Sequence, residues 1–134
     1  MNRRQVLKSV AGLTALAAVK PAAAEEFIDF TPELYAELLD TGKPFMLGFL
    51  SDWWPVCGSQ KRTVRALMQE NPEYADVQLL LADWDIYRNT PLRKDLKVVR
   101  RSTLIMFRDG EEVARVLAQT NKDVIEDLFL AAVG

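Results

Sequence analysis

Short apolar runs alternate with helical patterns along residues 26–134. Phe45–Leu50 and Val77–Ala82 are almost wholly apolar, as is typical of strands buried on both faces of a parallel sheet. Thr103–Phe107 and Val113–Leu117 flank the turn residues Arg108-Asp109-Gly110-Glu111, a pattern that predicts a β-hairpin. Glu26–Phe30 has the apolar side chains of a short edge strand.

The segments between these strands carry helix signals. Thr31-Pro32-Glu33 supplies an N-cap, a proline at the first helical position and an acid in the first turn. Further helices are predicted over Cys57–Glu70, over Leu92–Leu96, and from Asn121 onward, where apolar side chains recur at helical spacing. Because single strands and helices alternate before the hairpin, we predict an α/β three-layer sandwich with a mixed central sheet and helices on both faces.

Residues 1–24 have the pattern of an export signal peptide, which places the folded domain at residues 25–134. Met1–Lys8 is basic, Ser9–Val19 is a mildly apolar run, and Pro21–Ala24 ends on the A-x-A pattern of signal cleavage. Eleven residues are too few to cross a hydrocarbon layer of about 30 Å, so we expect no membrane association after cleavage.

The adjacent pair Arg3-Arg4 resembles the twin-arginine class of export signal. A general secretory signal with two incidental arginines is the alternative. Both predict a periplasmic protein in an oxidising compartment. Four of the 17 basic residues would leave with this segment while all 19 acidic residues stay, so the mature chain is more acidic than the net charge of −2 implies.

Composition excludes several classes of protein. The 134 residues include one Cys and no His, so the chain can close no intramolecular disulfide and lacks the commonest metal ligand and general base. Zinc fingers, Ser-His-Asp triads and Cys-His proteases are excluded, and we expect neither a cofactor nor a metal. The acidic balance gives no reason to expect nucleic-acid binding, and we expect a monomer.

Two motifs resemble the thioredoxin family. Phe49-Leu50-Ser51-Asp52-Trp53-Trp54-Pro55-Val56-Cys57 follows a predicted buried strand and opens a helix, like the thioredoxin segment that carries Trp-Cys-x-x-Cys. Arg101-Ser102-Thr103-Leu104-Ile105-Met106-Phe107-Arg108-Asp109-Gly110-Glu111 resembles the family's Pro-Thr, strand, turn and Gly-Glu hairpin. The resemblance covers Glu25–Gly134 and implies a thioredoxin-like fold and thiol-disulfide oxidoreductase ancestry.

The sequence departs from the family pattern at three positions. Trp54 stands at the place of the first, nucleophilic Cys, and Cys57 aligns with the second, resolving Cys. Since disulfide exchange within one protein needs an attacking and a resolving thiol, we expect no unaided turnover. Ser102 replaces the cis-proline, so a trans bond and a reshaped loop are expected. Gly48 replaces a buried Asp of the family.

Two interpretations of Cys57 stay open. It shares a helical face with the apolar Val64 and Met68, which favours a small buried hydrophobe. A reactive thiol is favoured by the helix N-terminus and by nearby cations that would stabilise a thiolate; these are Lys61, Arg62, Arg100 and Arg101. A reactive Cys57 would form mixed disulfides with a partner protein or a small thiol. In another register, Cys57-Gly58-Ser59 resembles the motif of single-cysteine glutaredoxins, with glutathione as resolving partner.

A non-catalytic binding module is the alternative from another functional class. Trp53, Trp54 and Pro55 lie beside Arg100, Arg101 and Ser102 in the expected fold, and this aromatic and cationic face would hold a peptide or partner protein. In the other interpretation Trp53 packs against the helix start and the arginines are solvated. Asp83 and Asp85 follow a buried strand, where carboxylates can act as an acid/base pair or hold a cation, but such acids more often cap a loop.

Overall fold

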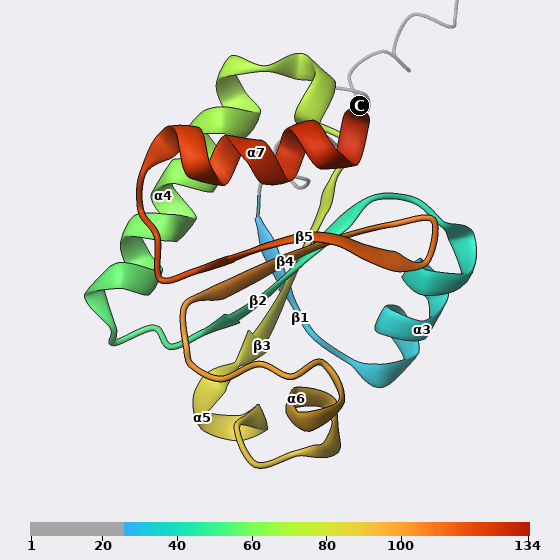
Figure 1. Cartoon of the computed structure of the whole chain (residues 1–134), viewed down its shortest axis with the longest axis vertical. Helices are drawn as coiled ribbons and strands as arrows, with labels where there is room; N and C mark the ends of the chain where they lie inside the picture. The colour runs from blue at the N-terminus through green and yellow to red at the C-terminus, as the bar shows by residue number, and fades with distance from the viewer. Residues whose placement is uncertain (1–25) are drawn as a thin grey trace, which may run out of the picture.

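The computed structural model describes residues 26–134 (Figure 1), so the predicted signal peptide lies outside the described residues. Within them, five strands and five α-helices alternate with one 3₁₀ turn. In chain order they are β1 (Phe27–Asp29), α3 (Pro32–Thr41), β2 (Phe45–Leu50), α4 (Pro55–Glu70), η2 (Pro72–Tyr74), β3 (Gln78–Asp83), α5 (Trp84–Tyr87), α6 (Pro91–Asp95), β4 (Thr103–Arg108), β5 (Glu111–Leu117) and α7 (Lys122–Val133).

The strands form one mixed sheet in the order β1-β3-β2-β4-β5. β3 pairs in parallel with both β1 and β2, β4 runs antiparallel to β2, and β5 runs antiparallel to β4. The turn of the β4–β5 hairpin uses two consecutive residues of positive φ, Asp109 and Gly110, as a tight hairpin requires. The mixed sheet predicted from the sequence is confirmed.

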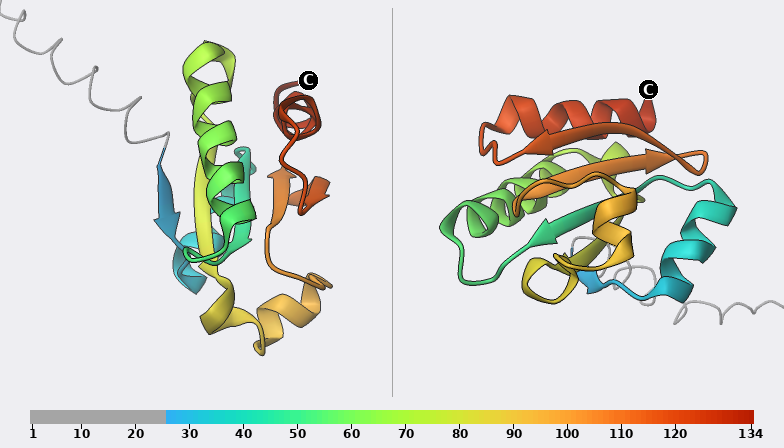
Figure 2. Two further views of the ribbon diagram at one scale, coloured as in Figure 1. Left: turned by 90° about the vertical axis from the view of Figure 1, so that its left-hand side faces the viewer. Right: turned by 60° about the horizontal axis from the view of Figure 1, so that its bottom comes forward.

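Alternating side chains of β2 fill two separate cores, one on each face of the sheet. Met46 and Leu50 pack into the core under α4 and α7, whereas Phe45, Leu47 and Phe49 pack into the core that faces α3 and α6. Every residue of β2 is buried, which explains why the strand is a continuous apolar run. Figure 2 shows the two helical layers on opposite sides of the sheet, so the three-layer sandwich is confirmed.

Local capping explains where the helices begin. The Thr31 hydroxyl accepts a hydrogen bond from the Leu34 backbone N–H at 3.1 Å, and Pro32 occupies the first helical position. α3 ends on Gly42 at φ 74°, a left-handed conformation that glycine adopts without penalty. The side chain of Asn121 accepts from the backbone N–H groups of Asp123 and Val124 at the start of α7.

Several predicted boundaries differ from those observed. α4 begins at Pro55, two residues before the predicted start at Cys57, because a proline at the first helical position needs no N–H partner. β5 begins at Glu111, where exposed polar residues gave no strand signal. α5 was not predicted, since a helix of four residues shows no periodicity. The 3₁₀ turn η2 was not predicted either, and the remaining strands and helices agree within one or two residues. Among residues 26–134, no helix has both the length and the apolarity that a membrane crossing needs.

Candidate functional site

The two predicted motifs meet where β2 ends, α4 begins and the chain enters β4. Ser102 connects these three elements through its backbone hydrogen bonds. Its backbone N–H donates to the Phe49 carbonyl at 2.7 Å, and its own carbonyl accepts from the Gln60 side chain and from the Ala118 N–H. The Gln60 side chain also donates to the Gln119 carbonyl, so buried polar contacts tie helix, loop and hairpin together.

Ser102 adopts a left-handed backbone conformation with φ 66°, which is uncommon for a residue with a side chain. The bond before it is trans, as predicted, and residues 26–134 contain no cis peptide. Ser102 is fully buried, and its hydroxyl lies 2.8 Å from the sulfur of Cys57.

Cys57 has no exposed surface. Its Sγ accepts from the Ser51 backbone N–H at 3.3 Å and contacts the Ser102 hydroxyl. The side chain packs in the same core as Val64 and Met68, which confirms the apolar face predicted from the helical spacing. Both groups that hydrogen-bond the sulfur are neutral, so these contacts give no support to the predicted stabilisation of a thiolate by cations.

The N-terminus of α4 has no side-chain cap. Trp54 is the N-cap residue, Pro55 follows it, and no acidic residue lies in the first turn of the helix. The nearest basic residue of α4 is paired, because Lys61 Nζ lies 3.4 Å from Asp52 Oδ1. The positive end of the helix dipole is therefore left without a neutralising side chain in the first turn.

Two tryptophans and an arginine gather beside this helix start. The Trp53 and Trp54 rings meet edge to face with centroids 5.5 Å apart, and the Arg101 guanidinium carbon lies 4.7 Å from one ring centroid and 4.9 Å from the other. Trp53 is 61% exposed, so most of its ring faces solvent rather than packing against the helix start. Its indole N–H donates to Asp85 Oδ2 at 2.8 Å.

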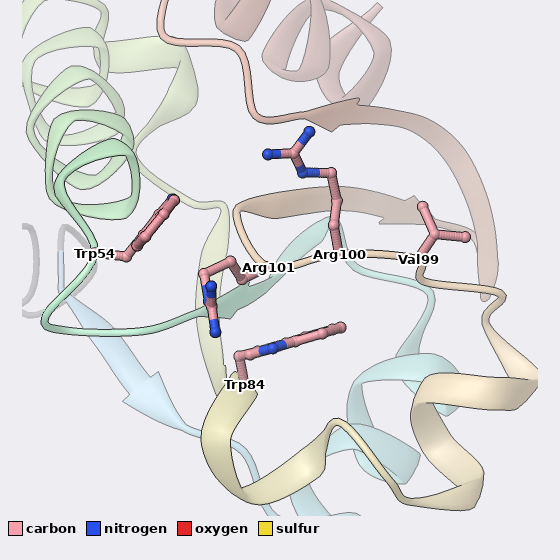
Figure 3. A pocket seen from close by; sticks show the side chains of 5 residues that line it. All are labelled: Trp54, Trp84, Val99, Arg100 and Arg101. Atoms are coloured by element: carbon pink, nitrogen blue, oxygen red, sulfur yellow. The ribbon is translucent and has the colours of Figure 1, made fainter.

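A shallow pocket of about 340 Å³ opens next to these rings. Figure 3 shows Arg101 projecting between Trp54 and Trp84, with Val99 and Arg100 on the same loop. We call Trp53, Trp54, Trp84, Arg100 and Arg101 the tryptophan–arginine surface. Sequence reasoning did not assign Trp84 to it, although its place directly after a parallel strand is where ligands commonly lie in α/β sheets.

The remaining candidates have structural roles or stand apart. Asp83 Oδ1 accepts from the Asp85 backbone N–H and so caps the start of α5, while Asp85 holds the indole of Trp53. Residues 26–134 contain no group of three or more potential metal ligands. Pro55 is exposed at the helix start. Arg100 is also exposed, while its carbonyl accepts from the Thr103 hydroxyl.

Comparison with known proteins identifies the family. No family model matches the chain. A thioredoxin from Mycolicibacterium smegmatis is 32% identical over 88 residues, which make up 64% of this chain and 75% of that protein. The chain belongs to the thioredoxin family. A thioredoxin of Mycobacterium tuberculosis is 30% identical over 86 residues, 64% of this chain and 71% of its own length.

Other thioredoxin relatives match in part or in fold alone. A bifunctional thioredoxin reductase/thioredoxin of Mycobacterium leprae is 28% identical over 88 residues, but the chain spans only 18% of that protein. The crystal structure of Trxlp from Edwardsiella tarda superposes with a TM-score of 0.68 at 24% identity, covering 75% of this chain and 96% of that one. A mutant thioredoxin of Halobacterium salinarum superposes with a TM-score of 0.64 at 23% identity, covering 84% of this chain and 95% of that one.

This thioredoxin-family chain has one cysteine and therefore no second thiol of its own. At Gly48, a side chain would meet tight packing, since an added Cβ would lie 3.1 Å from Leu50 Cδ1 and 3.2 Å from Leu104 Cδ2. Even a methyl group at this position would require these leucine side chains to shift by a few tenths of an ångström, so a larger acidic side chain would be crowded. The buried thiol lacks the proton-handling carboxylate that the resemblance associates with Gly48.

Proposed function

We propose that this protein is a non-catalytic member of the thioredoxin family that binds a polypeptide partner on its tryptophan–arginine surface. In this proposal Trp54 occupies the place of the attacking cysteine, and Cys57 is a retained structural residue. We favour this binding role over mixed-disulfide formation at Cys57 and over glutathione-assisted redox chemistry.

The observation that carries the proposal is the contrast in exposure between Cys57 and Trp53. The thiol is fully buried, and its sulfur is engaged by Ser51 and Ser102, so an incoming disulfide cannot reach it while the fold is intact. Trp53 is 61% exposed and Trp54 is partly exposed at the same helix start. Large aromatic side chains displayed on a surface beside an arginine are typical of interface anchors.

Thiol labelling tests whether Cys57 is unreactive in the native protein. We expect a water-soluble maleimide to leave the native protein unmodified and to label it fully in urea. The matched control is the double variant Trp54→Cys/Cys57→Ala, which moves the single thiol to the partly exposed N-cap position and should label quickly in the native state. Rapid native labelling of Cys57, or a mixed disulfide with oxidised glutathione, would favour the single-thiol alternatives instead.

Peptide selection tests the binding function. A library of random dodecapeptides inserted internally in a phage coat protein is selected on the immobilised native protein. We expect peptides that bind the native protein and lose binding to the Trp53→Ala variant, because this ring is the most exposed aromatic anchor of the surface. A selection that enriches nothing above a blocked support would contradict the proposed function.

Export to the periplasm is part of the same proposal and rests on residues 1–24. An epitope-tagged full-length chain should appear in the periplasmic fraction as a shortened form beginning near Glu25. Substituting Arg3-Arg4 by two lysines should hold the precursor in the cytoplasm if the twin-arginine route is used. Export that is unaffected by the substitution would indicate the general secretory route, and an unprocessed cytoplasmic chain would refute the proposal of export.

A further inference from the structure

We infer that the tryptophan–arginine surface recognises a carboxylate on the partner, carried by an Asp or Glu side chain within an extended segment. The inference rests on the proposed function and names the chemistry of the partner. It follows from two hydrogen-bond donors that lack partners and from two arginines that lack ion pairs on this surface.

Arg101 is the first of these groups. Its guanidinium lies over the Trp53 and Trp54 rings, and its Nε is buried with no hydrogen-bond partner. Across residues 26–134 the ion pairs involve other cations, and none joins Arg101 to an acid. Leaving a buried donor without a hydrogen-bond partner is unfavourable, so an acceptor supplied by a partner would compensate a cost that the free protein bears.

Trp54 adds a second unsatisfied donor at the same place. Its indole Nε1 is also buried without a partner, whereas Nε1 of the neighbouring Trp53 donates to Asp85. Both unsatisfied groups are donors, and both residues line the same pocket. A ligand that satisfies them must present hydrogen-bond acceptors, and a carboxylate offers two oxygens with about four acceptor sites.

Two carboxylates of the protein lie beside this surface, and each accepts a hydrogen bond from a neutral N–H group. Asp85 accepts from Trp53, and Asp83 caps α5. The uncapped start of α4 at Trp54 adds partial positive charge, and Arg100 lies exposed on the rim. Within residues 26–134 neither Arg100 nor Arg101 forms an ion pair with an acid, so both guanidinium groups are available to an anionic group of a partner.

The form of the pocket favours a side chain over a chain terminus. Backbone N–H groups arranged as a nest are the usual means of capturing a terminal carboxylate, whereas this pocket is shallow and is lined by indole, guanidinium and valine side chains. An extended segment can place one acidic side chain against Arg101 and apolar neighbours against the indole rings of Trp54 and Trp84.

The peptides recovered by the selection described above test this inference. We expect an Asp or Glu at one recurrent position among apolar residues. A recovered sequence is then synthesised with both ends capped, alongside its Glu→Gln counterpart, and binding is measured by isothermal titration. The glutamine peptide should bind about tenfold more weakly, equivalent to ~1.4 kcal/mol, and only the glutamate peptide should weaken strongly with added NaCl.

Matched variants locate the effect. Arg101→Met should remove the difference between the two peptides, whereas Arg65→Met, which deletes an exposed charge elsewhere on α4, should preserve it. Because the Glu→Gln change lies in the peptide, that comparison does not depend on how well a variant folds. Equal binding of both capped peptides would overturn the inference and leave the proposed function standing. Binding that requires an uncapped C-terminus would overturn the choice of a side-chain carboxylate.

Discussion

Restoring proline at position 102, where the thioredoxin resemblance places one, should destabilise this protein. Ser102 has φ 66°, whereas a proline ring holds φ near −65°, so the native backbone cannot accept the ring. Proline also removes the N–H that donates to the Phe49 carbonyl at 2.7 Å. The variant Ser102→Pro therefore combines a forbidden conformation with a broken buried hydrogen bond.

The magnitude follows from these separate losses. Leaving the Phe49 carbonyl without its buried partner costs about 1–3 kcal/mol, and losing the hydroxyl contact with Cys57 costs about 1 kcal/mol. Moving the loop out of its native conformation adds at least about 1 kcal/mol. We expect a total loss of about 3–5 kcal/mol in the free energy of unfolding, which is a large fraction of the stability of a small domain.

Two further substitutions separate the contributions. Ser102→Ala keeps the N–H and the left-handed strain but loses the hydroxyl, so it should cost about 1 kcal/mol. Ser102→Gly also loses the hydroxyl but relieves about 1 kcal/mol of strain, so it should be nearly neutral. Urea unfolding followed by tryptophan fluorescence gives all three values. A proline variant within about 1 kcal/mol of the parent protein, or an alanine variant more stable than the glycine one, would refute the reasoning.

Three other predictions concern the core and the helix start. Gly48→Asp, which restores the acid that the family resemblance expects, should destabilise by about 3 kcal/mol or more in urea unfolding, because an unpaired carboxyl would enter tight leucine packing; a neutral effect would show that β2 can shift. Burial, with the hydrogen bond from the Tyr74 hydroxyl to Glu126, raises the pKa of Tyr74 from 10.0 to about 12. The contribution of Tyr74 to the free energy of unfolding is fully present below pH 10 and is lost as the pH rises through about 12. The melting temperature of Tyr74→Phe should therefore fall less over that range than that of the parent protein, and an equal fall would contradict the raised pKa of Tyr74. Trp54→Cys should form an intramolecular disulfide with Cys57 under mild oxidant, detected by mass after alkylation; two free thiols would show that the alignment of the site is wrong.

The buried strands could be predicted from the apolar pattern of the sequence, whereas α5 and the start of α4 could not. β2 is apolar at every position because both of its faces are covered, and the sequence reveals that directly. α5 begins where the Asp83 side chain accepts from the backbone N–H of Asp85. Because α5 has only four residues, no periodic apolar pattern follows this cap, and the sequence there looks like a loop. The start of α4 was misplaced for a related reason, since Pro55 marks the first helical position only when the residues after it are known to be helical.

The residues of the candidate site other than Trp84 were predictable from the sequence, but their arrangement was not. The aromatic and basic residues stand in two motifs, and the resemblance brought the motifs together. The contacts of the buried Cys57 sulfur come from Ser51 and Ser102, which lie 6 and 45 residues away, so local sequence did not reveal them. The position of the exposed Trp53 ring depended on Asp85, 32 residues away. Trp84 joined the site through the pairing of β3 with β2, which no local pattern specifies.

The buried junction at Ser102 also fixes when the surface can exist during synthesis. Gln60 reaches across 42 residues to the Ser102 carbonyl and across 59 residues to that of Gln119. Contacts of such sequence separation form only after the intervening chain has been made and closed. A ribosome-bound chain that has not yet released Gln119 has all the tryptophans and arginines of the surface but lacks the hydrogen bond between Gln60 of α4 and the carbonyl of Gln119 after β5. The surface that we propose for partner binding is therefore completed only after the residues that follow β5 have been made.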